Sequence, residues 1–138
     1  MFVLDTNVVS ELRKAASGRA DAKVVRWALS TRPAAMFLSA IVLMELEQGV
    51  LLLERRDTRQ GAMLRQWLEQ QVRPAFEGRV LPVDDRVALS CARLHVPNPC
   101  KERDALIAAT ALVAGMTVVT RDTADFAATG VPLLNPWD

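Results

Sequence analysis

Short apolar runs alternate along this chain with segments in which apolar residues recur every three or four positions. The apolar runs at residues 2–4, 35–38, 79–83, 116–120 and 130–134 are each short enough to be a buried strand. The periodic segments predict helices over residues 8–12, 21–30, 40–54, 64–76, 86–94 and 105–114, with a helical turn at 125–126. This alternation predicts an α/β/α sandwich around a central, mostly parallel sheet of four to five short strands.

Polar residues mark the starts of several predicted helices. Ser39 precedes helix 40–54 and Asp84 precedes helix 86–94, and both side chains are good N-caps. Asp104 falls in the first turn of the very apolar helix 105–114, where the helix dipole favours a carboxylate, and Gly115 marks the end of that helix. For Asp104 taken alone, capping and a role in a site both remain open.

Three acids are placed so that they meet at one edge of the predicted sheet. Asp5 follows the first strand and Asp122 follows strand 116–120, while Asp104 opens a helix. Right-handed crossovers bring the carboxyl ends of parallel strands and the N-termini of the following helices to the same edge. Ligands bind at this edge in open α/β sheets, so we expect these carboxylates to share a site.

Glu45 is an unusual residue in the second turn of helix 40–54. At about 100° per residue it shares an apolar stripe with Ile41 and Val42, whereas Glu47 points about 200° away and can be solvated. A carboxylate on an apolar stripe is costly unless it is paired or bound to a cation. Glu45 is therefore the fourth acid of the predicted site.

Four clustered carboxylates repel one another unless a cation neutralises them. Oxygen ligands without nearby His or Cys favour magnesium or manganese over zinc, and magnesium usually also binds a substrate phosphate. One or two such ions can activate a water and stabilise the leaving oxygen of a phosphodiester. Hydrolysis of nucleic acid is the leading prediction, and the arginines between residues 55 and 103 offer contacts for a phosphate backbone.

Composition limits the other possibilities. The chain has 138 residues, 51% of them hydrophobic, and a net charge of only +1, which suits one compact domain and excludes a strongly basic nucleic-acid binder. No apolar run is long enough for a membrane span and no signal peptide is evident, so we expect a cytoplasmic protein without membrane contact. Cys91 and Cys100 are expected to be reduced and structural, and His95 to be structural or at the surface.

Six segments in order carry a resemblance to a known family: FVLDTNVVSEL, LSAIVLMELEQG, GRVLPVD, RDALIAATAL, VVTRDTADF and LLNPW. The chain resembles the PIN-domain ribonucleases of the VapC and FitB type, the toxins of bacterial type II toxin–antitoxin modules. The resemblance runs essentially end to end, and it implies a single PIN domain over residues 1–138.

The resemblance also implies roles for the four acids. Asp5 and Asp104 match the family's magnesium ligands, and manganese is expected to substitute for magnesium. Glu45 matches the acid of a helical E-x-x-x-G segment that Gly49 completes, and Asp122 matches the fourth acidic position. Glu45 and Asp122 are expected to act on the metal directly or through water.

Polar neighbours of the acids match supporting positions of the family. Thr6, Asn7 and Thr120 resemble its polar supports around the metal. Many relatives resemble TRN-x-x-DF where this chain reads TRDTADF, so Asp125 could share or replace the role of Asp122.

The family further implies partners. These are an RNA substrate, a homodimeric partner and a cognate antitoxin with a DNA-binding domain, through which alone the toxin would contact DNA. No motif identifies the RNA or the antitoxin.

Two alternative functions remain. A phosphatase with Asp5 as nucleophile normally has a second acid two residues on, where this chain has Asn7. A catalytically silent module that binds RNA or an antitoxin is the other alternative, although pure binding gains nothing from repelling carboxylates.

Overall fold

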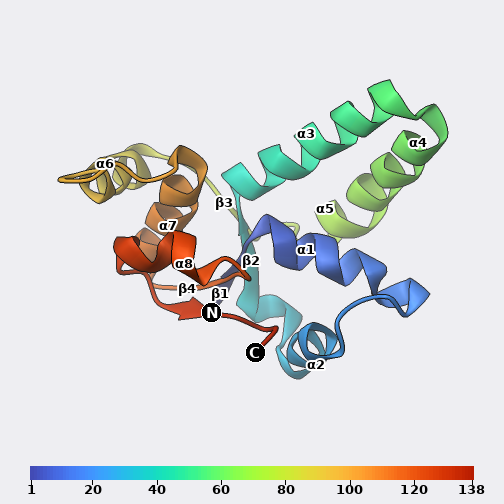
Figure 1. Cartoon of the computed structure of the whole chain (residues 1–138), viewed down its shortest axis with the longest axis horizontal. Helices are drawn as coiled ribbons and strands as arrows, with labels where there is room; N and C mark the ends of the chain where they lie inside the picture. Colours follow the sequence, from blue (N-terminus) through green and yellow to red (C-terminus); the bar gives the residue numbers. More distant parts are fainter.

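The computed structural model describes residues 1–138, which form five short strands surrounded by helices (Figure 1). The strands are β1 (Phe2–Leu4), β2 (Met36–Ser39), β3 (Val80–Leu81), β4 (Thr117–Val119) and β5 (Leu133–Leu134). Their order in the sheet is β3-β2-β1-β4-β5, and every neighbouring pair is parallel. The predicted α/β sandwich is confirmed, with a five-stranded sheet that is parallel throughout.

Two strands are shorter than the apolar pattern predicted. The segments 79–83 and 130–134 contribute only two residues each to the sheet, in β3 and β5. Pro82 directly follows β3 and Pro132 directly precedes β5. Because proline has no N–H to donate to a ladder, Pro82 ends the pairing of β3, and Pro132 takes part in the ladder only through its carbonyl, which accepts from the amide of Val118 (2.9 Å).

Eight α-helices complete the fold. They are α1 (Thr6–Arg13), α2 (Ala22–Ser30), α3 (Ala40–Arg56), α4 (Thr58–Trp67), α5 (Arg73–Ala75), α6 (Asp85–Leu94), α7 (Glu102–Ala114) and α8 (Thr123–Phe126). Short 3₁₀ turns are η1 (Lys14–Ser17), η2 (Pro33–Ala35) and η4 (Ala127–Thr129). In Figure 1 the α3–α4 hairpin projects to one side of the sheet and the α6–α7 pair lies on the other.

Helices α3 and α4 form a hairpin whose turn is shorter than the sequence predicts. The predicted helices 40–54 and 64–76 leave residues 55–63 between them, but α3 continues to Arg56 and α4 begins at Thr58. Asp57 alone makes the turn, because its carboxylate accepts a hydrogen bond from the amide of Gln60 (3.0 Å) and so caps α4. Beyond α4, the π-helical turn η3 (Leu68–Val72) widens the helix just before Pro74.

The predicted caps are confirmed. Ser39 accepts a hydrogen bond from the amide of Ile41 (3.1 Å), and Asp84 accepts one from the amide of Val87 (3.0 Å). Helix α7 begins three residues earlier than expected, and Asp104 still lies in its first turn. It ends at Gly115, whose φ of 70° lies in the left-handed region.

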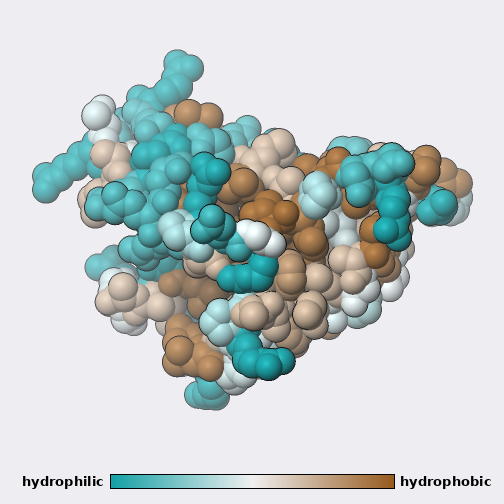
Figure 2. All heavy atoms as spheres, turned by 180° about the vertical axis from the view of Figure 1, so that it is seen from behind, coloured by the Kyte–Doolittle hydropathy of each residue, from teal (hydrophilic) through white to brown (hydrophobic).

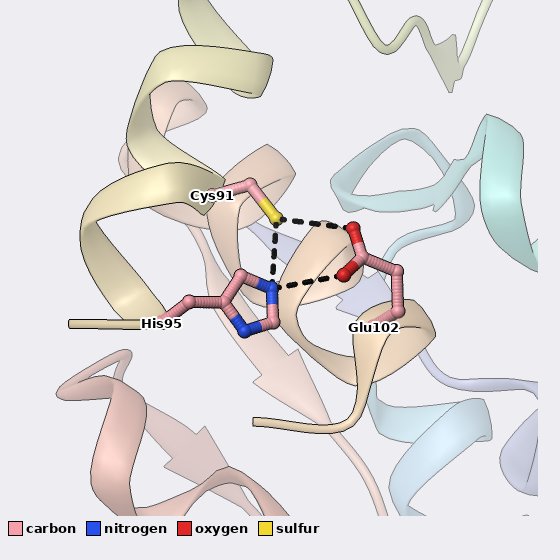
Figure 3. Close-up of side chains that lie close together, drawn as sticks. All are labelled: Cys91, His95 and Glu102. Carbon is pink, nitrogen blue, oxygen red and sulfur yellow. Dashed lines mark hydrogen bonds and ion pairs between the residues drawn. The ribbon is translucent and has the colours of Figure 1, made fainter. Parts of the chain in front are cut away.

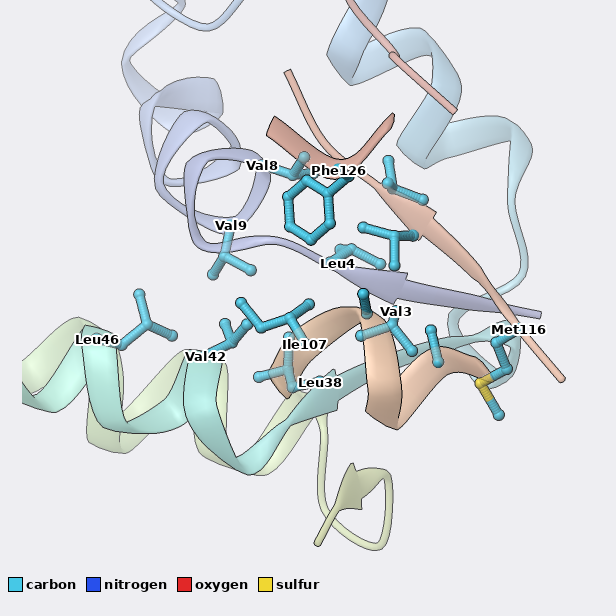
Figure 4. Packing of buried hydrophobic residues seen from close by; sticks show 14 of the residues in the cluster. Val3, Leu4, Val8, Val9, Leu38, Val42, Leu46, Ile107, Met116 and Phe126 are labelled. Carbon is cyan, nitrogen blue, oxygen red and sulfur yellow. The ribbon is translucent and has the colours of Figure 1, made fainter. Parts of the chain in front are cut away.

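The core lies between the sheet and helices α1, α3 and α7 (Figure 4). Val3, Leu4, Leu38, Ile107 and Phe126 are completely buried within it. Trp27 is half-buried and packs edge-on against Phe2, with ring centroids 5.4 Å apart. A smaller buried cluster between α6 and α7 consists of Val87, Cys91, Ala105 and Ala109.

No helix combines the length and the apolar character needed to cross a bilayer. Seen from behind, the molecule shows hydrophilic residues over the tip of the α3–α4 hairpin and hydrophobic ones nearer the middle of that face (Figure 2). Several apolar side chains of the hairpin are nevertheless exposed, among them Leu51, Leu52 and Met63.

Candidate active site

Asp5 is the most buried acid of the predicted site, with only 7% of its surface exposed. It follows β1 and caps α1, because its Oδ1 accepts a hydrogen bond from the amide of Thr6 (2.8 Å). Its Oδ2 accepts one from the hydroxyl of Thr120 (2.8 Å), the first residue after β4. The end of the neighbouring strand therefore fixes this carboxylate in position.

Glu45 is joined to the same strand end through Thr6. The hydroxyl of Thr6 donates to Oε1 of Glu45 (2.8 Å), which reaches across from the second turn of α3. The other oxygen of Glu45, Oε2, lies 3.6 Å from Nη1 of Arg103 on α7. Glu45 therefore lies in the site, as its position on the apolar stripe of helix 40–54 predicted.

Asp122 enters the site through Asn7. The Nδ2 of Asn7 donates to Oδ2 of Asp122 (3.1 Å) and lies 3.5 Å from both Oδ2 of Asp5 and the hydroxyl oxygen of Thr120. The amide of Asp122 donates to that hydroxyl oxygen (3.0 Å), and the side-chain oxygen Oδ1 of Asn7 accepts from the backbone amide of Arg121 (3.3 Å). Asn7 therefore couples two acids that are 117 positions apart in the sequence.

Asp104 is half-buried at the start of α7 and lies within electrostatic reach of Asp125. Burial is the largest cause that raises the pKa of Asp104. The carboxylates of Asp125, Glu45 and Asp122 raise this pKa further, and Lys101 lowers it. Lys101 also forms an ion pair with Asp125, its Nζ lying 3.3 Å from Oδ2.

Burial and neighbouring carboxylates also raise the pKa of Asp5. Its pKa rises from 3.8 to about 6, first because the side chain is buried. Hydrogen bonds from Thr120 and Thr6 lower the pKa, while the carboxylates of Asp104 and Glu45 raise it. The structure therefore brings the four predicted acids and Asp125 within electrostatic reach of one another. We call these five residues the acidic cluster.

The acidic cluster fits a hard divalent cation. Its donor atoms are carboxylate oxygens supported by hydroxyl and amide groups, and such oxygen donors suit Mg²⁺ or Mn²⁺. Burial is the main cause of the raised pKa values of Asp5 and Asp104, and repulsion from neighbouring carboxylates raises both pKa values further. A bound cation would relieve this repulsion.

Glu47 lies outside the cluster, as its helical phase predicted. Both of its oxygens accept from the guanidinium of Arg65 on α4, at 2.7 Å each. This pair lowers the pKa of Glu47, first through the hydrogen bonds from Arg65. Glu47 therefore joins the two arms of the helical hairpin, whereas Glu45 belongs to the site.

The sequence offered Arg103 only as one of several arginines for a phosphate backbone, and it did not predict that Lys101 and Arg103 contact acids of the site. Both precede Asp104 at the start of α7 and place positive charge against acids of the cluster. The only available signal was their position beside Asp104, since the acids they contact are remote in sequence.

A second group of reactive side chains, Cys91, His95 and Glu102, lies between α6 and α7 (Figure 3). Nε2 of His95 is 3.1 Å from Oε2 of Glu102 and 3.8 Å from Sγ of Cys91. The Nδ1 of His95 accepts a hydrogen bond from the amide of Cys100 (3.0 Å), so the ring proton resides on Nε2 and is donated to Glu102. These bonds account for the position of the ring, and they leave Nε2 without a lone pair for a metal ion. Both cysteines are free thiols, as predicted.

Comparison with known proteins agrees with the geometry. The model of one family, the PIN domain, matches residues 2–131. The chain belongs to the PIN-domain family.

Individual relatives define the type of PIN domain. The toxin FitB of Neisseria gonorrhoeae is 41% identical over 143 residues, covering 99% of each chain. The VapC ribonuclease Y4jK of Sinorhizobium fredii is 39% identical, over 100% of this chain and 99% of the relative. The crystal structure of FitAcB from N. gonorrhoeae contains a chain that superimposes with a TM-score of 0.90 and 38% identity, with 99% of each chain covered. This PIN domain is therefore of the VapC and FitB toxin type.

Proposed function

We propose that this PIN domain, formed by residues 1–138 as a single unit, is a metal-dependent endoribonuclease toxin of a type II toxin–antitoxin system. Magnesium is the proposed cofactor, and manganese can substitute for it. The observation that carries the proposal is the acidic cluster, in which carboxylates from four separate segments share one edge of the sheet and the buried Asp5 has a pKa raised to about 6, mainly by its burial. The names of the relatives, a VapC ribonuclease and the toxin FitB, support the same activity.

Each acid has a proposed part. Asp5 and Asp104 would hold the metal ion directly, and Glu45 and Asp122 would hold it directly or through water. A magnesium ion, when bound, supplies positive charge that acidifies a water and stabilises the leaving oxygen of the phosphodiester.

The polar supports hold the acids in place for this chemistry. Thr6 orients Glu45, Thr120 orients Asp5, and Asn7 orients Asp122 through the hydrogen bonds described above.

Asp122 is a better candidate than Asp125 for the fourth acid. Asp122 is bonded to Asn7, whose amide also lies beside Asp5, whereas Asp125 is partly neutralised by Lys101. Asp125 is then a supporting residue. The amide of Asn7 is also the reason not to propose an Asp5-nucleophile phosphatase, because it supplies no second carboxyl group for proton transfer.

The proposal includes the partners of a toxin. One related structure is FitAB bound to a DNA fragment; a chain in it superimposes with a TM-score of 0.90 and 37% identity, over 100% of this chain and 96% of that chain. We propose that this toxin is likewise neutralised by an antitoxin with a DNA-binding domain and meets DNA only through it. We also propose a homodimer, which is supported by the exposed apolar side chains Leu51, Leu52 and Met63 on the helical hairpin.

The test is cleavage of a mixed, labelled RNA pool by the purified chain with magnesium, with manganese and with chelator. Metal-dependent cleavage that Asp5→Ala abolishes is the expected result. A wild-type protein that binds metal through Asp5 but leaves every RNA of a total cellular pool intact would favour the silent binding module instead.

A further inference from the structure

Arg103 differs from Arg65, another ion-paired arginine of the helices. Arg65 donates two hydrogen bonds of 2.7 Å to Glu47 and contacts Glu54 and Glu69 as well. The guanidinium of Arg103 donates no hydrogen bond, and its nearest acid is Glu45, with Nη1 3.6 Å from Oε2. The N–H groups of the Arg103 guanidinium are therefore free to bind a ligand, whereas those of Arg65 already donate hydrogen bonds to acids.

Glu45 does not depend on Arg103 for its position. Its Oε1 accepts a 2.8 Å hydrogen bond from the Thr6 hydroxyl, which holds the carboxylate whether or not the guanidinium is present. The side chain of Arg103 is 45% exposed and that of Glu45 is 23% exposed. The guanidinium therefore lies at the solvent side of the acidic cluster, where an incoming ligand can reach it.

A polyanion that approaches the acidic cluster needs positive charge at its rim. Lys101 already pairs with Asp125 through an ammonium group that makes a 3.3 Å contact. The planar guanidinium of Arg103 can donate hydrogen bonds to two oxygens of one phosphate. Because a guanidinium is more weakly hydrated than an ammonium group, it loses less hydration when it binds the phosphate.

We propose that Arg103 is a substrate-binding residue with two successive partners. Without metal it offsets the charge of Glu45, and once a cation occupies the acidic cluster it binds a phosphate of the RNA backbone. This inference rests on the proposed function, since it assigns the substrate contact of the same site.

The first measurement is metal affinity by calorimetry, without RNA. Removing a positive charge beside the acids should strengthen Mg²⁺ binding by Arg103→Gln about three- to tenfold at low ionic strength. Arg103→Lys keeps the charge and should bind Mg²⁺ as the wild type does. Arg55→Gln is the matched control, because this substitution removes the same charge at a remote position. Arg55 is exposed on α3, about 15 Å along the helix from Glu45.

The second measurement is the affinity of a labelled single-stranded RNA of mixed sequence for the Ca²⁺-loaded protein, with the RNA checked to be intact. Ca²⁺ is a hard cation that binds carboxylates. Arg103→Gln should weaken RNA binding about tenfold. It should also flatten the slope of log affinity against log salt by about 0.7, the value for one lost phosphate contact with a single strand. Arg103→Lys should weaken binding less and keep the slope.

The outcomes separate this inference from the proposed function. If wild type cleaves RNA but Arg103→Gln keeps the wild-type RNA affinity and salt slope, Arg103 does not bind substrate and the nuclease stands. Weaker Mg²⁺ binding in that variant would equally overturn the inference, because Arg103 would then be organising the acids rather than competing with the metal. If wild type neither binds nor cleaves RNA, the proposed function fails and the phosphate contact fails with it.

Discussion

Replacing Asp5 by Asn should make the metal-free protein more stable near neutral pH, although Asp5 is a central residue of the site. Each pKa unit corresponds to about 1.4 kcal/mol at 25 °C. Lifting the pKa of Asp5 from 3.8 to about 6 therefore costs about 3 kcal/mol of folding free energy at pH 7. Asn keeps the cap on α1 but weakens the hydrogen bond with Thr120, which costs about 1 kcal/mol. We expect a net gain of about 2 kcal/mol for Asp5→Asn.

The stability that Asp5→Asn gains over wild type should decrease as the pH falls. Because the folded pKa of Asp5 is raised, wild type gains stability as pH falls through about 6, and the gain is complete only below 3.8, where the carboxyl group is protonated in both states. The advantage of Asp5→Asn should therefore shrink from about 2 kcal/mol at pH 7.5 to nearly zero at pH 4.5.

Urea unfolding in chelator, at several pH values between 7.5 and 4.5, measures this difference directly. In Mg²⁺ the order should reverse, since a cation at one hundred times its Kd adds about 2.7 kcal/mol to a protein that binds it. The reasoning is wrong if Asp5→Asn is less stable than wild type in chelator at pH 7.5, or if the difference does not change with pH.

The remaining predictions concern activity and the helical hairpin. Asp104→Asn should reduce RNA cleavage about a hundredfold or more while the circular dichroism spectrum stays that of wild type; undiminished cleavage would remove Asp104 from the site. Glu45→Gln should lose cleavage, whereas Glu47→Gln should cleave within about twofold of wild type and lose about 1 kcal/mol of stability with its ion pair. Equal loss of cleavage in these two variants would show that the assignment of helix faces is wrong. Gly61→Ala should destabilise the protein by about 1–3 kcal/mol in urea unfolding, because a Cβ there would lie 2.5 Å from the backbone of α3. Gly49→Ala is its control, since a Cβ there meets nothing within 4 Å, and it should be neutral or slightly stabilising; equal effects at both glycines would contradict the close packing of the hairpin.

The local pattern was sufficient for most elements of the fold. Apolar runs identified all five strands, and the caps Ser39 and Asp84 were recognised because a cap satisfies amides only two or three residues away. The helix turn at Asp57 was missed, since the arginines on either side read as a polar break although they are exposed helical residues. Helix ends set by a single capping contact leave little trace in composition.

The sequence by itself determined where the four acids stand on their elements: after β1, after β4, and in the opening turns of α3 and α7. Only the tertiary structure decided what surrounds them. The contact of Arg103 with Glu45 joins residues 58 positions apart, and the link from Asn7 to Asp122 spans 115. Such contacts depend on how helices pack on the sheet, to within an ångström. Periodicity predicts the face that a side chain occupies, but it does not carry the distance to a residue on another element.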